Sequence, residues 1–499
     1  MKLERRFYQL YIIHQIKKCL ERNENCIVEL DAGLGKCVIM YLLAKHLPNK
    51  NILIITPSRA SLADTALFFE EMSKTDKINI RFDYLKQGMP HQLRKKILEE
   101  SRVVLSTPIT LTRTLSRYSE LTQKWDLVII NEVDKIIKRI AYAEETSDIE
   151  GMAVKLTTAN RFSVTKRVRK TKLTYPWNEL IKLIPDKCII VGMSGTLRDK
   201  HIIHTGEKIA LKEEIKTLLE TVFKAKKTKI ITMDELLKKT DVWRYTQRNL
   251  TIIRTIPIHD EKIQTIDKIL SEEIESILKR LAKKERADDY TVIERAISLL
   301  EDEPTKFKLI RLVLARRFLV ASYPQHYIQF LNKPFIKQLL ERKTNKKLNE
   351  LVPKESSKIK KICEIVEAWV KQGSKVAILS SFVRTTRLIA KTLKEKNLRV
   401  FTLTGTTLNK EEVLRDFKNS GDVLCFSPVG ERDIDLPVDV LIIHDIIRTA
   451  KTMYQRMKRG RRSFVLITFY GGTHEERKVS SLLIEIKRKY PWTIRIYSE

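Results

Sequence analysis

The stretch "CIVELDAGLGKCVIMYLLAKHL", residues Cys26–Leu47, decides the fold of this protein. Its β-branched start predicts a buried strand, its end has the length and apolar content of a helix, and a turn with two glycines separates them. In such a unit, glycines let backbone N–H groups approach a phosphate, and a following lysine can reach the outer phosphates of a nucleotide. Gly33, Gly35 and Lys36 have this arrangement, so the stretch predicts a parallel α/β sheet with a phosphate-binding loop.

The same alternation of strands and helices occurs twice in the chain, on either side of a helical segment. The first series of strand-like runs lies between residues 26 and 195, and the second begins near Lys375. Between them, apolar residues recur at steps of three and four, which predicts helices that bury one stripe against a neighbour. This stripe consists of Ile263, Ile266, Leu270, Ile274, Ile277 and Leu281. We therefore predict two α/β domains, at 1–197 and 354–499, joined by a helical insertion at 198–353.

Charge and cysteine usage narrow the class of protein. The 499 residues include 95 Lys and Arg against 62 Asp and Glu, and this net charge of +33 favours a polyanionic partner such as nucleic acid over the alternative of a merely basic, soluble protein. The 6 cysteines form no C-x-x-C pair, and no apolar run reaches about 18 residues, so we expect no zinc site, disulfide scaffold or membrane span. A soluble, cytoplasmic protein is expected. The basic segment Arg161–Lys172 is consistent either with phosphate binding or with a solvated loop.

Two further stretches contain residue types suited to nucleotide chemistry. "NEVD" follows the buried run "DLVII", at a place where acidic residues of parallel sheets serve a metal ion and the attacking water. Asn131 stands at its first position, and Glu132 remains able to orient or deprotonate water. "YQRMKRGRR" (Tyr454–Arg462) spaces its cations so that they could reach a γ-phosphate. Taken singly, the first pattern is also typical of a loop after a strand, and the second of a solvated basic helix.

In this order, the stretches resemble the motifs of superfamily 2 helicases, most closely the archaeal Hef helicase region with its Fanconi-anaemia M-type and RIG-I-like relatives. "RRFYQ" is similar to the adenine-recognition element of that group, "LDAGLGKC" to its phosphate loop, and "MSGT" (Met193–Thr196) to its coupling motif. The resemblance implies that nucleotide is bound by Gln9, Gly33, Gly35, Lys36 and Asp435, and that catalysis uses Glu132, Gln455, Arg459 and Arg462. It implies contacts to nucleic acid from Thr56, Pro57, Arg59, Thr107, Pro108, Ser380, Thr404 and Gly405.

The resemblance also implies an architecture and a reaction. It implies two tandem RecA-like motor domains that bind ATP between them, and a thumb-like helical insertion that helps to grip a duplex. Branched or duplex DNA is then favoured over RNA, with a role in DNA repair or replication and with any nuclease supplied by a separate chain. "ERKVSS" (Glu476–Ser481) resembles the start of a nuclease motif, but Leu482 stands where that motif has its trailing Asp, so we expect a helical tail instead.

Several positions depart from the pattern of those helicases. Cys37 stands where a Thr or Ser hydroxyl supports Mg²⁺, and Asn131 stands where an Asp does. Asp433 replaces a glycine near the triphosphate, and Lys458 and Arg461 replace further glycines. Because Mg²⁺ prefers oxygen ligands, we expect the metal to be held poorly. The expected function is that of a helicase-like protein that binds ATP and nucleic acid with impaired ATP hydrolysis; the alternative is a fully active ATP-dependent DNA or RNA helicase or translocase.

Overall fold

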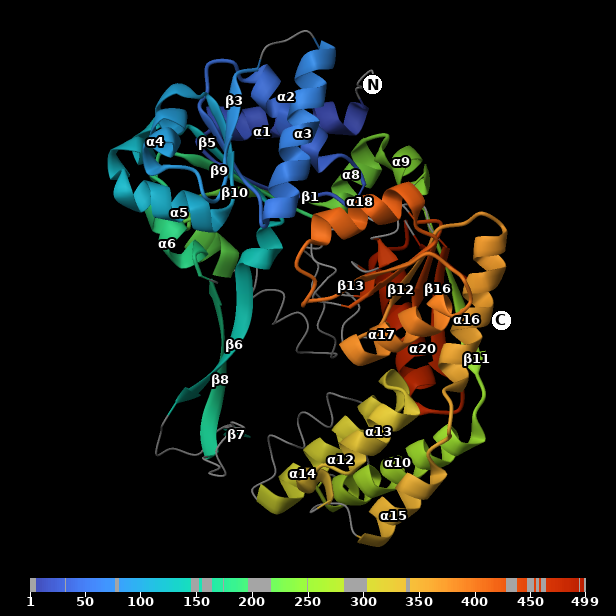
Figure 1. Ribbon diagram of the computed structural model, residues 1–499. Coiled ribbons are helices and arrows are strands. Elements are labelled where there is room, and N and C mark those ends of the chain that lie inside the picture. The colour runs from blue at the N-terminus through green and yellow to red at the C-terminus, as the bar shows by residue number, and fades with distance from the viewer. Residues whose placement is uncertain are drawn as a thin grey trace. The chain divides into compact units, whose positions relative to one another are not determined.

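The computed structural model divides by contacts into two compact units, one formed by Met1–Tyr142 and Arg169–Asn249, the other by Ala143–Val168 and Leu250–Glu499. The structure describes residues 6–31, 33–76, 80–144, 152–154, 164–173, 175–195, 217–248, 250–281, 303–337, 342–427, 438–446, 453–454, 457–458, 464–492 and 494–497. Each unit contains a parallel sheet covered by helices, as Figure 1 shows along the coloured chain. The predicted α/β fold with two parallel sheets is therefore confirmed.

The first unit is built on a seven-stranded sheet with the order β10-β1-β9-β5-β2-β4-β3. Its strands are β1 (Asn25–Glu29), β2 (Ile52–Ile55), β3 (Phe82–Leu85), β4 (Val103–Ser106), β5 (Leu127–Asn131), β9 (Ile189–Ser194) and β10 (Thr228–Ile231). All of these pairings are parallel. Since the carboxyl ends of parallel strands share one edge, the turns after β1, β9 and β5 are neighbours.

The helices of the first unit follow the strands along the chain. They are α1 (Phe7–Glu21), α2 (Lys36–His46), α3 (Arg59–Asp76), α4 (His91–Glu100), α5 (Pro108–Arg117), α6 (Trp177–Leu183), α8 (Met233–Lys239) and α9 (Val242–Arg248), with the short turns η1 (Ser119–Lys124), η2 (Val133–Ile136) and η3 (Leu218–Val222). One face of the sheet packs alternate strand residues such as Leu53, Val104 and Val128 against Leu111 and Leu115 of α5. Most strands of this sheet are buried along their whole length, which explains why they read as short, continuous β-branched runs.

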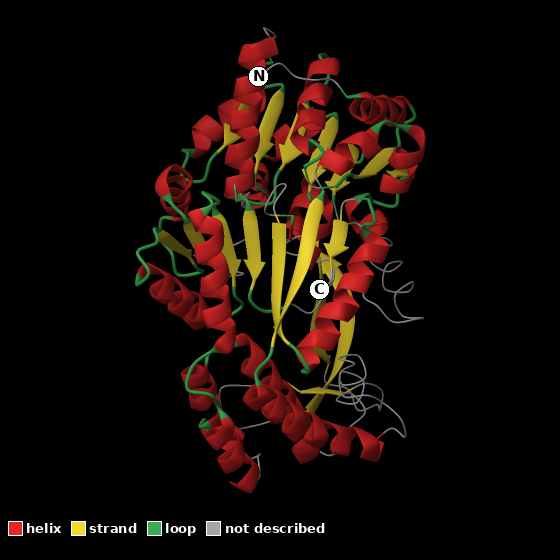
Figure 2. Cartoon of the chain, turned by 90° about the vertical axis from the view of Figure 1, so that its right-hand side faces the viewer, coloured by secondary structure: helices red, strands yellow, loops and turns green. Residues whose placement is uncertain are grey.

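The second unit contains another seven-stranded parallel sheet, with the order β13-β14-β12-β15-β16-β11-β17. Its strands are β11 (Thr251–Ile258), β12 (Val376–Leu379), β13 (Val400–Leu403), β14 (Val423–Phe426), β15 (Val440–Ile443), β16 (Phe464–Tyr470) and β17 (Ile494–Tyr497). Its pairings are likewise parallel. Figure 2 shows the yellow strands of the parallel sheets with red helices packed beside them.

Both faces of the second sheet are buried by helices. Alternate strand residues pack on one face against α16 (Ser357–Lys371) and α17 (Val383–Lys394). The intervening residues pack on the other face with side chains of α18 (Lys410–Ser420) and α20 (His474–Lys489). The segment predicted as a helical tail forms the helix α20, but it does not follow the last strand, because β17 after it returns to the sheet beside β11.

A helical bundle lies between the strands β11 and β12 in the chain. It contains α10 (Glu261–Leu281), α12 (Glu303–Ala321), α13 (Pro324–Leu331), α14 (Pro334–Lys337) and α15 (Arg342–Leu351). The predicted apolar stripe is confirmed from Ile263 to Ile277, because these side chains of α10 form a buried cluster with Leu309, Leu312 and Leu319 of α12. None of the helices described for this chain combines the length and apolar content that crossing a membrane requires.

The segment 198–353, predicted to be helical, also contains strands of both sheets. β10 pairs with β1 of the first sheet, and β11 pairs with β16 of the second. The helical bundle therefore occupies only the part of this segment after Glu261. Both strands are β-branched runs, "TKII" and "TIIRTIPI", whose strand signal is hidden among the helices α8, α9 and α10 around them.

A third, three-stranded sheet follows β5 in the chain. Its order is β6-β8-β7, with β6 at Ile137–Glu144, β7 at Met152–Val154 and β8 at Val164–Leu173, and β7 pairs with β8 in antiparallel fashion. β8 contains most of the basic segment for which a loop was one of two expectations. Its ten residues include five Lys or Arg and no Asp or Glu, a composition that gives little strand signal.

Candidate functional site

The phosphate loop lies between β1 and α2, as the sequence predicts. Gly33 and Gly35 both adopt left-handed backbone conformations, with φ of 80° and 79°. The left-handed conformation of Gly35 favours glycine whatever the space, and a Cβ atom there would also lie 2.8 Å from Nε2 of Gln9, which would have to shift. Helix α2 begins at Lys36, which places the loop at the N-terminus of a helix, where backbone N–H groups attract anions.

Lys36 of this loop forms an ion pair with Glu132, which follows β5. The distance from Lys36 Nζ to Glu132 Oε1 is 2.7 Å, and the two side chains are only 13% and 20% exposed. Burial lowers the pKa of Lys36, but the carboxylates of Glu132, Asp134 and Asp31 outweigh this effect, so its pKa is raised above the ordinary value. Two site residues predicted from separate stretches are therefore in direct contact, and the lysine is held as a cation.

The backbone of Glu132 is unusual for its residue type. Its φ of 56° lies in the left-handed region, which costs a non-glycine residue about 1–3 kcal/mol. Glu132 lies in the turn between the end of β5 and the start of η2. In this conformation its carboxylate accepts a hydrogen bond from Lys36. Strain of this kind is concentrated at functional sites, so the geometry supports a role for Glu132 beyond packing.

The acidic turn after β5 is also tied to the neighbouring strand β9. The Ser194 hydroxyl donates to Oδ1 of Asp134 at 2.5 Å, and Ser194 is the last residue of β9. β9 lies between β1 and β5 in the sheet, so the "NEVD" and "MSG" stretches meet beside the phosphate loop. Thr196 of the predicted coupling motif lies outside the described residues.

Two side chains beside the loop, Cys37 and Asn131, differ from those that the resemblance to helicases implies for Mg²⁺. Cys37 Sγ lies 3.9 Å from the hydroxyl of Thr65, and that hydroxyl donates to the Ser61 carbonyl. Asn131 presents a neutral amide, whose Oδ1 is buried without a hydrogen-bond partner among the described residues. The same described part of the chain contains no group of three or more His, Cys, Asp or Glu side chains able to hold a metal ion. A thiol and an amide thus stand where a hard cation prefers anionic or hydroxyl oxygen.

Gln9, predicted to read the base, lies in the first turns of α1 beside the phosphate loop. Its side chain is 1% exposed, and its Nε2 donates to the Tyr8 hydroxyl at 3.3 Å. Its Oε1 is buried and has no hydrogen-bond partner among the residues that the structure describes. Because a buried amide oxygen is costly to leave unsatisfied, this atom is suited to accept a hydrogen bond from a ligand.

The two loops of the first unit that are predicted to contact nucleic acid come together after β2 and β4. These strands pair directly, and the N–H of Thr56 donates to the carbonyl of Ser106 at 2.9 Å. Thr56 is fully buried, Pro57 is half-buried, and Arg59, the first residue of α3, is exposed. Of this set, Arg59 has the exposed side chain, whereas Thr56 is buried in the loop.

Thr107 and Pro108 begin the helix after β4. Thr107 is the N-cap residue of α5 and Pro108 its first residue, an arrangement that proline favours. The Thr107 hydroxyl donates to that of Thr110 at 3.1 Å, and Thr107 is 8% exposed. These residues fix the start of α5, whose N-terminal N–H groups would be the part able to bind a phosphate.

In the second unit, Ser380 and Thr404 follow β12 and β13, which flank β14 in the sheet. Both are buried, whereas Gly405 is exposed. The N–H of the adjacent Ser381 donates to Oδ1 of Asp445 at 2.8 Å, so a buried carboxylate after β15 fixes this loop. Asp445 was not predicted, because nothing in the sequence around it resembles a motif.

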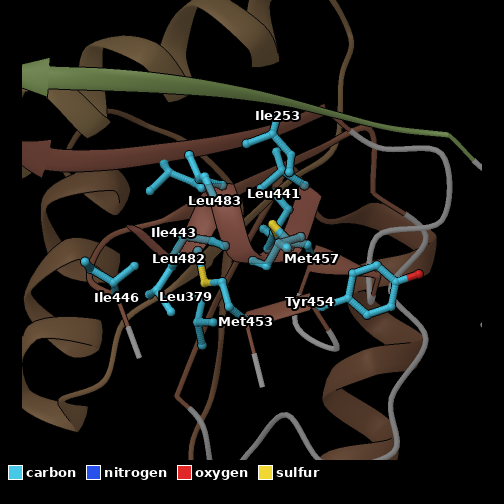
Figure 3. Close-up of a cluster of buried hydrophobic side chains, with 14 of the residues drawn as sticks. Ile253, Leu379, Leu441, Ile443, Ile446, Met453, Tyr454, Met457, Leu482 and Leu483 are labelled. Atoms are coloured by element: carbon cyan, nitrogen blue, oxygen red, sulfur yellow. The ribbon is translucent and has the colours of Figure 1, made fainter. Parts of the chain in front are cut away.

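The remaining predicted residues, Asp433, Asp435, Gln455, Arg459, Arg461 and Arg462, lie outside the described residues. Figure 3 shows a core of the second unit, with Met453, Tyr454 and Met457 among its buried side chains. The ring of Tyr454 stacks on that of Tyr490 of the tail, with 3.7 Å between centroids. Tyr454 and Met457 of the "YQRMK" stretch are therefore buried, which does not fit a wholly solvated helix.

Comparisons with known proteins agree with this arrangement. The DEAD/DEAH box helicase model matches residues 7–202, and the helicase conserved C-terminal domain model matches residues 357–463. Among solved structures, the chain is similar to the Hef helicase domain of Pyrococcus furiosus, with a TM-score of 0.58 and 17% identity over 96% of this chain and 98% of that one. It is also similar to the DUF1998 helicase MrfA bound to DNA, with a TM-score of 0.55 and 11% identity over 98% of this chain and 49% of that one. At these identities the two structures bear on the fold alone. A search of curated protein sequences finds no significant match.

Proposed function

Since the chain belongs to the superfamily 2 helicases, we propose that it binds ATP at the phosphate loop of its first unit, binds nucleic acid, and hydrolyses ATP weakly. The family that the sequence resemblance implied is thus confirmed. Members of this family use ATP and bind nucleic acid. The residues of this chain's own site decide how well it would hydrolyse ATP.

The ion pair between Lys36 and Glu132 is the observation that carries the proposal. It joins the residue that would bind the outer phosphates to the carboxylate that would orient or deprotonate water. The glycine conformations and the start of α2 beside them supply backbone N–H groups for the phosphates. These features favour retained nucleotide binding.

Weak hydrolysis is proposed because two groups that would stabilise charge in the transition state are altered. Cys37 and Asn131 replace a hydroxyl and a carboxylate, and removing a single electrostatic contact to a transition state costs about 3 kcal/mol, or roughly 10² in rate. Mg²⁺ would be held less firmly for the same reason. The alternative of a fully active motor is favoured by the retained Lys36 and Glu132 contact.

Branched or duplex DNA is proposed as the partner, with a role in DNA repair or replication beside separate proteins such as a nuclease. The net charge of +33 supports a polyanion, and the exposed Arg59 beside the β2 and β4 loops supports contacts to a phosphate backbone. DNA is favoured over RNA because of the similarity to the Hef group. Duplex RNA is the comparison ligand in the experiment below.

The testing experiment is steady-state ATP hydrolysis with Mg²⁺, alone and with forked DNA or duplex RNA, beside the Lys36→Ala variant. We expect binding of ATP and DNA together with turnover well below about 1 per second, the low end of ordinary enzyme rates. Stimulated turnover at ordinary rates that Lys36→Ala abolishes would establish the active motor instead. A wild-type protein that binds neither ATP nor nucleic acid would contradict both readings.

A further inference from the structure

Tyr8 joins the base-reading segment to the phosphate loop. It lies in the first turn of α1, its ring is fully buried, and its hydroxyl donates to the carbonyl of Leu34 at 2.6 Å. Leu34 lies between the two left-handed glycines of the loop. The hydroxyl therefore contacts the backbone of the loop at the residue between its two bends.

The hydroxyl of Tyr8 uses its full bonding capacity at this junction. It accepts from Nη1 of Arg6 and from Nε2 of Gln9, each at 3.3 Å, while it donates to Leu34. A phenolic hydroxyl has one donor and two acceptor positions, and all three are occupied. Burial raises the pKa of Tyr8 above its ordinary value, so the group stays protonated and able to donate.

Tyr8 also contacts residues near the end of the first unit's sequence, around α9. Its backbone N–H, one of those at a helix N-terminus that lack an intrahelical partner, donates to Oδ1 of Asp241 at 2.9 Å. The ring of Tyr8 lies 5.4 Å from the ring of Tyr245 in α9, measured between centroids. The guanidinium of Arg6 lies 4.3 Å from the centre of the Tyr245 ring. The segment around α9 thus fixes the position from which Tyr8 reaches the loop.

We propose that Tyr8 is a positioning residue that holds the Leu34 carbonyl, and with it the phosphate loop, in the conformation that accepts a triphosphate. The inference rests on the proposed binding of ATP at this loop. A hydrogen bond buried at a bend restrains the backbone on both sides of it, and the N–H groups of the loop keep their orientation. Tyr8 acts on phosphate binding through Leu34, and it need not contact the nucleotide.

The test compares Tyr8→Phe with Tyr11→Phe, which removes the same atom from the same helix. Tyr11 donates to Oε1 of Glu235 at 2.8 Å, away from the loop, and serves as the matched control. Dissociation constants are measured by calorimetry for ATP and for inorganic tripolyphosphate, which lacks the base. We expect Tyr8→Phe to weaken both ligands by a similar factor, about three- to tenfold, and Tyr11→Phe to leave both within about twofold of the wild type.

The outcomes separate this inference from the proposed function. Weakening of ATP alone would place the effect of Tyr8 at Gln9 and overturn a role at the loop, as would unchanged binding of both ligands. A wild-type protein that binds neither ligand would contradict the proposed function and the inference with it.

A second pair of variants covers the case in which Tyr8→Phe folds poorly. Asp241→Asn keeps an oxygen that accepts from the Tyr8 N–H, whereas Asp241→Ala removes it. We expect Asp241→Ala to weaken tripolyphosphate at least twofold more than Asp241→Asn does. Equal binding by the two would contradict the inference.

Discussion

At the scale of single residues, side chains that match the helicase pattern stand directly beside side chains that depart from it. Lys36 and Glu132 are in contact, while their chain neighbours Cys37 and Asn131 are a thiol and an amide where the resemblance implies a hydroxyl and a carboxylate. The sequence predicted all four, because each lies in a local pattern of loop, strand or helix start. It did not predict Tyr8 or Asp445, whose contacts join residues 26 and 64 positions apart and arise only from the packed fold.

Restoring the altered pair tests whether the remaining site is intact. The double change Cys37→Thr with Asn131→Asp returns a hydroxyl and a carboxylate, and we expect the rate of ATP hydrolysis with Mg²⁺ to rise by about 10² or more. Steady-state turnover at saturating ATP measures this. The same double change with Lys36→Ala is the control and should stay inactive. A restored pair with unchanged turnover would mean that other parts of the machinery have also been lost.

The left-handed backbone of Glu132 gives a second residue-scale prediction. Glu132→Gly and Glu132→Ala both remove the ion pair with Lys36, but only alanine keeps the strain at a φ of 56°. We expect the glycine variant to have the higher free energy of unfolding, by about 1 kcal/mol, in urea denaturation. At the exposed Glu364 within helix α16 the order should reverse, since glycine is the poorer helix former there. The same order at both positions would contradict the explanation by backbone strain.

At the scale of elements, the strands with a strong apolar signal were predicted, whereas others, such as β17 and β8, were not. The runs that form β1, β2, β4, β5, β9, β12, β14 and β15 are buried along their whole length, and this is why they read clearly as strands. β17 lies at an edge of its sheet, and its residues are only partly buried. β8 is rich in Lys and Arg, so its hydrogen bonding to β7 leaves no trace in a hydrophobic pattern.

A buried contact between α10 and α20 should make the free energy of unfolding depend on pH. His474 at the start of α20 is 3% exposed, and its ring lies 2.5 Å from Oδ1 of Asp267 in α10. Burial lowers the pKa of His474 more than the nearby Asp267 raises it, and the cations Arg316 of α12 and Lys478 lower it further. The folded protein therefore keeps this ring neutral at a pH where the unfolded chain takes up a proton.

The sign of the effect follows from this difference. Below the ordinary histidine pKa of about 6.5, the unfolded state binds the extra proton, so the free energy of unfolding falls with acidification and is fully retained at higher pH. We expect His474→Asn, which can still donate to Asp267 but cannot titrate, to lose about 1 kcal/mol less stability than the wild type between pH 7.5 and 5.5. Urea denaturation at both pH values measures this. Parallel losses in the two proteins would show that His474 does not contribute.

At the scale of the whole molecule, charge is the property that the sequence fixes without any knowledge of the fold. A net charge of +33 predicts that the affinity for nucleic acid falls steeply with salt, since each phosphate contact contributes about 0.9 to the slope of log affinity against log salt. We expect a slope of several units for duplex DNA in a filter-binding or anisotropy titration. A slope near zero would contradict binding through the phosphate backbone.

The same titration tests the basic strand β8. Changing Lys166, Arg169 and Lys172 to Gln should reduce the slope by up to about 3 if all three contact phosphates. The matched control changes Lys360, Lys371 and Lys391, exposed on α16 and α17, and removes the same net charge. An equal reduction in both triple variants would mean that β8 makes no contact of its own.

The ion pair between Lys36 and Glu132 also has a consequence for how the proposed nucleotide would bind to Lys36. Lys36 has Glu132 as its anionic partner in this structure, so under the proposed function a triphosphate that binds Lys36 would compete with that carboxylate. The carboxylate displaced in this exchange is the one suited to act on water. Under the proposed function, Glu132 would therefore become available to act on water only once the nucleotide has taken its place beside Lys36.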